Sequence, residues 1–323
     1  LLPVPLFCSA RLCSYLLRGE ISKALPPSLG TAHLSPLREC MAVGLLAYEV
    51  SDLCIGKPPV RPLPLSATVG DALRALSRCR ETYLSVWAER SPESPLPSQK
   101  TAPAASSTCV GKVCMVDVVC YLCAEENVAS PSAALSSPVS VLLAEGSGRL
   151  VRHVERHSSV LEALDLILEG AQKLVVPLRG GAASRKKPHT STRDFCWLAP
   201  EDLVRFFLDS IGAFSPVPAL SVESLGLVRR DFLAVRPHEP ALSAVPLIRK
   251  ALASQAAVAV VTDDGKLVGE ISPSALAGCG EAAAAAAAGA LATLSAGELV
   301  AYLGCGGDLP EEAREAVRAR LRR

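Results

Sequence analysis

The chain has 323 residues, half of them hydrophobic, so it can build one or more sizeable cores, and its length predicts about two domains. Its 33 basic and 32 acidic residues nearly cancel and only 4% of its residues are aromatic, which argues against nucleic-acid binding by charge or base stacking. No apolar run reaches the roughly 18 residues that a membrane helix needs, so the sequence predicts a soluble protein without a membrane partner.

The first forty residues differ in composition from the rest of the chain. Scattered Pro, Ser and Cys fill this stretch, and Pro3 and Pro5 interrupt its apolar start. We therefore expect residues 1–40 to be an unstructured, non-native extension, with Met41 as the natural start; a transit peptide is the alternative. Twelve cysteines without even spacing predict a reducing compartment and no structural disulfides, and we expect a cytoplasmic protein.

Three segments with helical periodicity share one register. In each, an aligned Ala has apolar residues three positions before it, one after it and four after it, which predicts one buried helical face. The segments are SATVGDALRAL (66–76), HSSVLEALDLI (157–167) and HEPALSAVPLI (238–248), and the aligned residues are Ala72, Ala163 and Ala244.

Short extended segments flank each of these helices. Those before the helices are 59–63, 149–154 and 231–235, and those after them are 82–87, 173–178 and 257–261. Each copy then closes with a strand that runs into a helix, at GKVCMVDVV (111–119), CWLAPEDLV (196–204) and GEISPSAL (269–276). The third copy joins its last two strands through TDDGK (262–266), which predicts a hairpin with an Asp-Gly turn. The order strand, helix, strand, strand, helix therefore occurs three times.

A fourth copy is only partial. ATLSAGELV (292–300) has the pattern of the strand-to-helix corner, but too little chain precedes it for the rest of a copy. We expect either a truncated fourth copy or an elaborated end of the third. The Ala tract at 281–290 favours a helix or a tolerant loop about equally.

The repeated pattern resembles the CBS (cystathionine-β-synthase) domain. MAVGLLAYEVSDLCIGKPPV (41–60) and LSAGELVAYL further resemble a plant family of proteins with tandem CBS motifs, and the resemblance extends from residue 41 to about 303. It implies an α+β fold of CBS motifs packed as pairs, the first two (about 50–212) as one pair. The implied domains are motif 1 (41–125), motif 2 (126–212), motif 3 with a partial motif 4 (213–303) and a C-terminal tail (304–323).

The resemblance also implies nucleotide contacts at the corners. In this family a corner Asp binds the ribose hydroxyls, and a Ser or Thr three residues earlier helps to hold a phosphate. Asp117 and Asp202 match the ribose position, Ser272 matches the hydroxyl position, and Ser295 with Glu298 match both in altered form.

No corner carries the whole signature. Cys114 and Ala199 stand where the hydroxyl is expected before Asp117 and Asp202, and Ala275 replaces the Asp after Ser272. The alternative role for the acidic residues is to cap the first helical turn, where a carboxylate satisfies backbone N–H groups and the helix dipole.

The sequence contains no P-loop, nucleophile elbow or H-E-x-x-H motif, and we expect no enzymatic activity. We instead expect a regulatory protein that needs no cofactor, binds AMP, ADP or ATP between CBS motifs, and regulates a partner of the kinase or thioredoxin type. A homodimer is one expected assembly. The alternatives are a scaffold that binds no ligand and a redox enzyme based on Cys120 and Cys123; an apolar helix around that pair favours a packing role.

Overall fold

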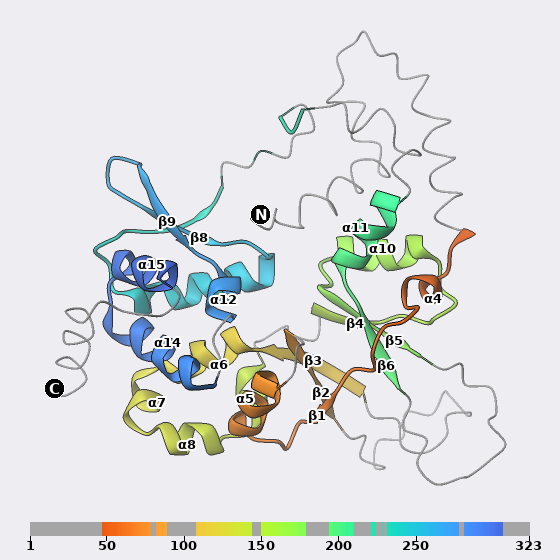
Figure 1. Ribbon diagram of the computed structural model, residues 1–323, viewed down its shortest axis with the longest axis horizontal. Helices are drawn as coiled ribbons and strands as arrows, with labels where there is room; N and C mark the ends of the chain where they lie inside the picture. Colours follow the sequence, from red (N-terminus) through yellow and green to blue (C-terminus); the bar gives the residue numbers. More distant parts are fainter. Residues whose placement is uncertain are drawn as a thin grey trace, which may run out of the picture. The chain divides into compact units, whose positions relative to one another are not determined.

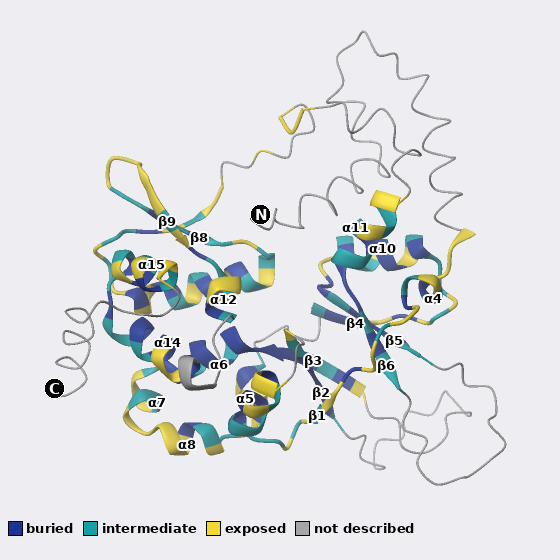
Figure 2. Cartoon of the chain, viewed as in Figure 1, coloured by how far each residue is buried: buried dark blue, intermediate teal, exposed yellow. Residues whose placement is uncertain are grey.

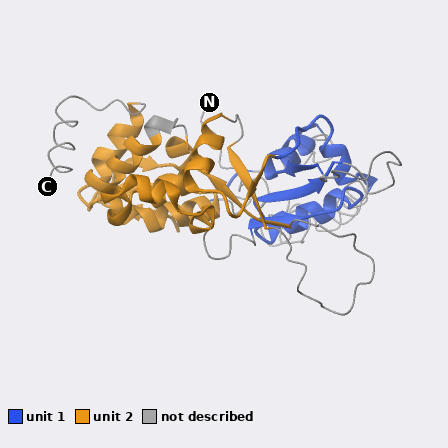
Figure 3. Ribbon diagram, turned by 90° about the horizontal axis from the view of Figure 1, so that it is seen from below, with its two compact units in different colours: residues 1–60, 148–230 blue, residues 61–147, 231–323 orange. Residues whose placement is uncertain are grey.

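The computed structural model describes residues 47–78, 82–88, 108–143, 150–178, 194–209, 221–223, 228, 231–277 and 281–305. Within it the chain divides into two compact units, and neither is one continuous stretch of sequence. Unit 1 joins Leu1–Val60 to Gly148–Arg230, and unit 2 joins Arg61–Ser147 to Asp231–Arg323 (Figure 3). The extension predicted at 1–40 lies outside the described residues, as does most of the loops at 90–108 and 179–194.

Unit 1 carries motif 2. Its sheet has the order β4 (Val151–His153), β5 (Lys173–Pro177), β6 (Phe195–Leu198), with β4 parallel and β6 antiparallel to β5. Helix α10 (Val160–Leu168) connects β4 to β5, and α11 (Pro200–Asp209) follows β6. The short helix α4 (Val50–Leu53) also belongs to this unit (Figure 1).

Unit 2 carries motifs 1 and 3. Motif 1 consists of β1 (Pro62–Pro64), α5 (Val69–Arg78), β2 (Tyr83–Ala88), β3 (Thr108–Cys114) and α6 (Met115–Leu122). Helices α7 (Glu125–Ala129) and α8 (Pro131–Ser136) and a 3₁₀ turn (Val139–Leu142) follow it. Motif 3 consists of β7 (Leu233–Val235), a 3₁₀ turn (Ala241–Ala244), α12 (Val245–Ser254), β8 (Val258–Val261), β9 (Leu267–Ile271) and α13 (Pro273–Ala277), followed by α14 (Glu281–Thr293) and α15 (Ala296–Gly304). Each sheet repeats the topology of unit 1, which confirms the predicted α+β class.

The three aligned alanines occupy equivalent buried positions. Ala72, Ala163 and Ala244 are each 0% exposed, the first two within α5 and α10 and the third just before α12. The third copy starts with a 3₁₀ turn because Pro246, in the first turn of α12, has no N–H to donate to the preceding turn. The register predicted from the periodicity is therefore confirmed, apart from this local shortening of the α-helix.

Three short segments, which we call bridge segments, close the motifs by the same backbone pairing. They are residues 48–53, 137–142 and 294–299, and each forms an antiparallel bridge to the residue before a motif helix: Glu49 to Ser159, Pro138 to Thr68, and Ser295 to Pro240. Two N–H···O bonds flank every bridge, namely Val50–Ser158 (2.8 Å) with Val160–Tyr48 (2.9 Å), Val139–Ala67 (2.7 Å) with Val69–Ser137 (2.9 Å), and Ala296–Glu239 (2.8 Å) with Ala241–Leu294 (2.8 Å). Each bridge thus satisfies a free N–H at a helix start.

The first two bridge segments are exchanged between motifs. Residues 48–53 precede the strands of motif 1 in the sequence, but they lie in unit 1 and close the helix of motif 2. Residues 137–142 precede the strands of motif 2, but they lie in unit 2 and close the helix of motif 1. The compact units therefore interleave along the chain instead of following the order of the motifs.

The prediction of a strand-to-helix corner at 292–300 is wrong. Helix α14 runs to Thr293, so the chain reaches Ser295 from a helix and not from a strand. The Ala tract supplies this helix because Ala has the highest helix propensity of any residue. Residues 294–299 repeat the backbone pairing of the other two bridge segments. Each segment also has a small or acidic residue at or next to its bridge, namely Glu49, Ser137 and Ser295.

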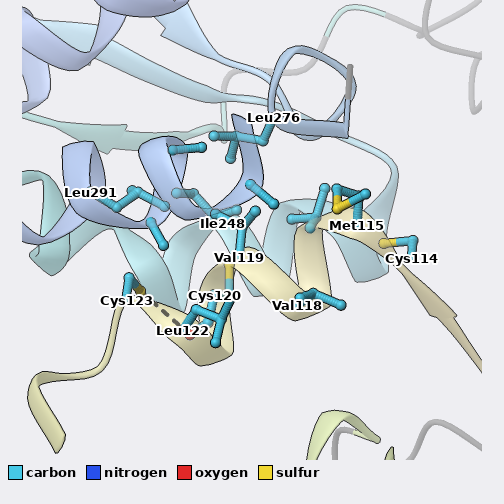
Figure 4. Packing of buried hydrophobic residues seen from close by; sticks show 14 of the residues in the cluster. Cys114, Met115, Val118, Val119, Cys120, Leu122, Cys123, Ile248, Leu276 and Leu291 are labelled. Carbon is cyan, nitrogen blue, oxygen red and sulfur yellow. Dashed lines mark hydrogen bonds between the residues drawn. The ribbon is translucent and has the colours of Figure 1, made fainter. Parts of the chain in front are cut away.

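A hydrophobic core in unit 2 is shared by motifs 1 and 3. Helix α6 packs against α12, α13 and α14, and Val119, Ile248 and Leu291 in this core are each 0% exposed (Figures 2 and 4). In unit 1 the core contains Leu174 of β5 and also Val50, which the bridge segment contributes. The domain boundaries and the pairing of the first two motifs stay predictions.

Candidate functional site

The corner of motif 1 places Asp117 in the first turn of α6. The Oδ2 atom of Asp117 accepts the backbone N–H of Cys114, the residue before the helix, at 2.8 Å. Asp117 is half-buried, whereas Cys114 is buried. The carboxylate therefore caps α6, as the alternative role for this residue predicted.

Two cations lie near the Asp117 carboxylate. Burial raises the pKa of Asp117, while the hydrogen bond from Cys114 and the nearby charges of Lys112 and Arg249 act in the opposite direction. Lys112 of β3 places its Nζ 4.0 Å from the centroid of the Tyr83 ring. Arg249 comes from α12 of motif 3, and its Nη2 donates to the carbonyl oxygen of Cys120 in α6 at 3.3 Å. The corner thus combines one carboxylate with cations from two motifs.

The raised pKa of Asp117 predicts a distinctive pH dependence. The folded protein binds a proton at the Asp117 carboxyl more tightly than the unfolded chain does. Protonation of Asp117 therefore adds stability to the fold as pH falls from the raised pKa towards the unfolded pKa of about 3.9. An Asp117→Asn variant lacks this gain, so the parent should gain stability relative to the variant between pH 7 and pH 4. Urea unfolding at several pH values measures the difference.

Asp71 provides a control of opposite sign. It also caps a motif helix, since its Oδ2 accepts the N–H of Thr68 at 3.1 Å, but hydrogen bonds from Thr68 lower its pKa. The contribution of Asp71 is present above its unfolded pKa and is lost as pH falls through the lower folded value. The parent should therefore keep its stability relative to Asp71→Asn between pH 7 and pH 4 and lose it only below about pH 4, the unfolded pKa of Asp. Equal pH dependence for the Asp117 and Asp71 variants would contradict the assignment.

The corner of motif 2 is occupied by an ion pair. Asp202 accepts the N–H of Ala199 at 2.8 Å through Oδ2, and Lys57 places its Nζ 2.7 Å from Oδ1. The side chains of Lys57 and Asp202 are only 23% and 13% exposed. Lys57 follows the exchanged bridge segment, so this segment brings a cation to the carboxylate. Both oxygens of Asp202 are thus already engaged.

The remaining predicted residues lie at the starts of two other helices. Ser272 precedes α13, where its Oγ lies 2.6 Å from the Oγ of Ser274. Ser295 and Glu298 form a reciprocal capping box at the start of α15: Ser295 Oγ accepts the Glu298 N–H at 3.3 Å, and Glu298 Oε2 accepts the Ser295 N–H at 2.8 Å. The structure brings Ser295 and Glu298 together, and it separates Asp117 and Asp202 into different units.

Sequence reasoning missed the three cations at the corners. Lys112 lies within the predicted strand GKVCMVDVV, so its proximity to Asp117 was within reach of the sequence. Lys57 and Arg249 lie far along the chain from their partners, and no local pattern marks them as neighbours of a corner.

Cys120 and Cys123 lie at the buried end of α6. They are 2% and 1% exposed, and the Cys123 Sγ donates to the Cys120 carbonyl oxygen at 3.4 Å (Figure 4). Burial raises the pKa of Cys120 to about 12 and also raises that of Cys123, which opposes thiolate formation. These observations favour the packing role. Among the described residues, no cluster of three or more His, Cys, Asp or Glu side chains could bind a metal, and no helix is long and apolar enough to cross a bilayer.

Comparison with known proteins agrees with this repeated topology. A family model described as CBS domain matches residues 222–278, the range that contains β7 to α13. CBS domain-containing protein CBSX5 of Arabidopsis thaliana is 41% identical over 300 residues, which cover 87% of this chain and 73% of that protein. The chain belongs to the family of CBS domain-containing proteins. The β1–α6 and β4–α11 segments of this CBS-domain protein repeat the topology of the matched range.

Two more distant similarities were found for this CBS-domain protein. A SNF1-related protein kinase regulatory subunit gamma-like protein, PV42b of Arabidopsis thaliana, is 22% identical over 73% of this chain and 72% of its own length. Among solved structures, a putative archaeal homolog of g-AMPK from Methanocaldococcus jannaschii is 14% identical, with a TM-score of 0.45 over 84% of this chain and 79% of that chain.

Proposed function

We propose that this CBS-domain protein is a non-enzymatic regulator that binds an adenine nucleotide at the Asp117 corner and transmits the bound state to a partner protein. The observation that carries the proposal is the half-buried Asp117 carboxylate with Lys112 and Arg249 nearby. A carboxylate can accept hydrogen bonds from two vicinal ribose hydroxyls, and cations suit the phosphates of AMP, ADP or ATP.

The position of Arg249 suggests how binding would be transmitted. This side chain belongs to motif 3 but bonds to the backbone of α6 in motif 1, across the core that the two motifs share. A phosphate that attracts Arg249 would compete with the Cys120 carbonyl oxygen and would favour one packing of α12 against α6. Such a differential interaction is what a ligand needs in order to shift a conformational equilibrium.

The other predicted residues contribute less to this proposal. A ribose at Asp202 would have to compete with the 2.7 Å ion pair from Lys57 in a mostly buried position. Ser272, Ser295 and Glu298 already hydrogen-bond within their own helix starts. Their roles in nucleotide binding stay predictions, and Asp117 is the residue on which the proposal depends.

Calorimetric titration of the chain with AMP, ADP and ATP tests the proposal. We expect heat with at least one of them, and an Asp117→Ala variant should bind at least tenfold more weakly because it loses the diol acceptor. Asp71→Ala is the matched control, since it removes a helix-capping carboxylate from α5 and should leave the heat unchanged. Absence of both heat and thermal shift at millimolar nucleotide would remove the sensor role.

A scaffold without a ligand is the second candidate function. The Lys57–Asp202 ion pair favours it, because it uses a corner carboxylate to fasten a bridge segment instead of leaving it for a ligand. For either function, the name of the PV42b relative supports a kinase-type partner over a thioredoxin-type partner. Partner binding that is indifferent to nucleotides and to Asp117→Ala would favour the scaffold.

A further inference from the structure

Cys54 and Cys196 form a buried pair of thiols in unit 1. Cys54 directly follows α4 and the exchanged bridge segment, and Cys196 lies in β6 of motif 2. They are 8% and 0% exposed, and both belong to the hydrophobic core of this unit. The two thiols are free and are hydrogen-bonded to each other. Two sulfur atoms far apart in the sequence therefore meet where the bridge segment joins motif 2.

Two contacts hold the stretch after Cys54 against motif 2. The backbone N–H of Val60 donates to the carbonyl oxygen of Phe195 in β6 at 2.7 Å. The Nζ of Lys57 lies 2.7 Å from Oδ1 of Asp202 in α11. These contacts keep the paired sulfur atoms within reach of each other. A disulfide needs such preorganisation, because its S–S bond is only about 2.05 Å long and its two backbones must already be close.

The surroundings of the pair favour a thiolate at Cys196. The hydrogen bond from Cys54 lowers the pKa of Cys196 and the charge of Lys57 acts in the same direction, whereas burial and Asp202 oppose them. The same hydrogen bond raises the pKa of Cys54, so Cys54 keeps its proton. Because the thiolate is the nucleophilic form of cysteine, one sulfur is suited to attack an oxidant and the second thiol is in position to displace the product.

Buried cysteines of unit 2 are arranged differently. The Cys123 thiol donates to a backbone carbonyl oxygen instead of to the Cys120 sulfur, and burial raises the pKa of both residues. The Cys109 thiol likewise donates to the carbonyl oxygen of Gly111 at 3.4 Å, and burial raises its pKa to about 11. These thiols therefore provide an internal comparison for the reactivity of the Cys54–Cys196 pair.

A surface turn follows Cys54 directly. Ile55, the next residue, is 81% exposed, and Gly56 is also exposed. Segments at the surface with few buried contacts open locally at the lowest free-energy cost, so opening of this turn gives a small oxidant such as hydrogen peroxide access to the sulfur atoms. We expect oxidation to be slower than at an exposed thiol and faster than at the thiols in the core of unit 2.

We propose that Cys54 and Cys196 form a reversible disulfide when the protein is exposed to a peroxide, and that this bond fastens the exchanged bridge segment to motif 2. The Cys196 thiolate attacks a peroxide oxygen, the O–O bond breaks, and hydroxide leaves a sulfenic acid on Cys196. The Cys54 sulfur then attacks the Cys196 sulfur, and the S–O bond breaks. The two hydroxides take the protons of the two thiols, so two thiols lose two electrons and one peroxide becomes two waters. A dithiol reverses the reaction by exchange. This proposal is independent of nucleotide binding.

Mass spectrometry of the full chain after treatment with hydrogen peroxide tests the proposal. Remaining thiols are alkylated under denaturing conditions, and the peptides are mapped without reduction. We expect a linked peptide pair that joins Cys54 to Cys196, disappears with dithiothreitol, and forms about tenfold or more faster than a link between Cys120 and Cys123. Cys54→Ser should instead leave a sulfenic acid on Cys196 that dimedone captures. Cys120→Ser is the matched control, because it replaces a buried cysteine of α6 and should leave the link unchanged.

Thermal unfolding measures the fastening. The bond closes a long loop and restricts the unfolded chain, so the oxidised parent should melt a few degrees above its reduced form, and dithiothreitol should remove the gain. Cys54→Ser should show no gain, and Cys120→Ser should show the gain of the parent. The proposal would be overturned if Cys54 and Cys196 stayed reduced at a dose that oxidises the exposed Cys305, or if other links formed equally fast. A link without a thermal gain would overturn the fastening role.

Discussion

Replacement of Val50 by Asp is expected to lower the free energy of unfolding of unit 1 by about 3–5 kcal/mol, the cost of an unpaired charge in a core. Val50 is 0% exposed and belongs to the hydrophobic core of that unit. Its N–H also donates to Ser158 at the start of α10, so the variant disturbs the bridge together with the core. Urea unfolding combined with amide hydrogen exchange measures both effects, and the loss of protection should appear in α10.

Ile55→Asp is the matched control for this variant. Ile55 lies five residues further along the chain and is 81% exposed, so the same substitution should change stability by less than about 0.5 kcal/mol. The location of the effect is as informative as its size. If Val50→Asp exposed the amides of α5 in motif 1 and spared α10, the exchange of bridge segments would be incorrect.

Replacement of Ile248 by Ala should cost about 2–5 kcal/mol, as expected when a fully buried aliphatic side chain is truncated and a cavity remains. Ile248 is 0% exposed in α12 and belongs to the core that joins motif 3 to α6 of motif 1. The two motifs should therefore be destabilised together. Hydrogen exchange should report faster opening in α6 as well as in α12, with a single unfolding transition for unit 2.

Leu242→Ala serves as the control for Ile248→Ala. Leu242 lies in the 3₁₀ turn before α12 and is 39% exposed, so its truncation removes less buried surface and should cost clearly less. Faster exchange confined to β7, β8 and β9, with α6 unchanged, would show that motif 3 folds independently and that the shared core has little energetic weight.

The repeated helices and strands could be predicted because their signals are local. The i, i+3, i+4, i+7 pattern around Ala72, Ala163 and Ala244 reports one buried face whatever the partner is. The Asp-Gly hairpin was predicted for the same reason, and it is confirmed by Gly265 at φ 82° with Thr262 donating to Lys266 at 2.9 Å. Prediction failed at 292–300, where a bridge segment was taken for a strand-to-helix corner. The two look alike in sequence because each has a small residue, here Ser295, followed three residues later by an acidic one, here Glu298.

The candidate site could be predicted only in part. A carboxylate in the first turn of α6 follows from the corner motif, and the structure places Asp117 there. The cation that pairs with Asp202 comes from position 57 and the one near Asp117 from position 249, and these distances along the chain depend on how the motifs pack. No periodicity within a single motif contains that information.

Because the bridge segments are exchanged, the boundaries of the sequence repeats do not coincide with the boundaries of the compact units. A fragment cut at a repeat boundary would keep the bridge segment that pairs with the neighbouring motif and would lose the bridge segment that pairs with its own helix. Motif 2 isolated from residue 126 onward would lack Val50 and Lys57, and with them part of its core and the counterion of Asp202. Single repeats expressed as fragments should therefore unfold less cooperatively than unit 1 or unit 2 does in the intact protein.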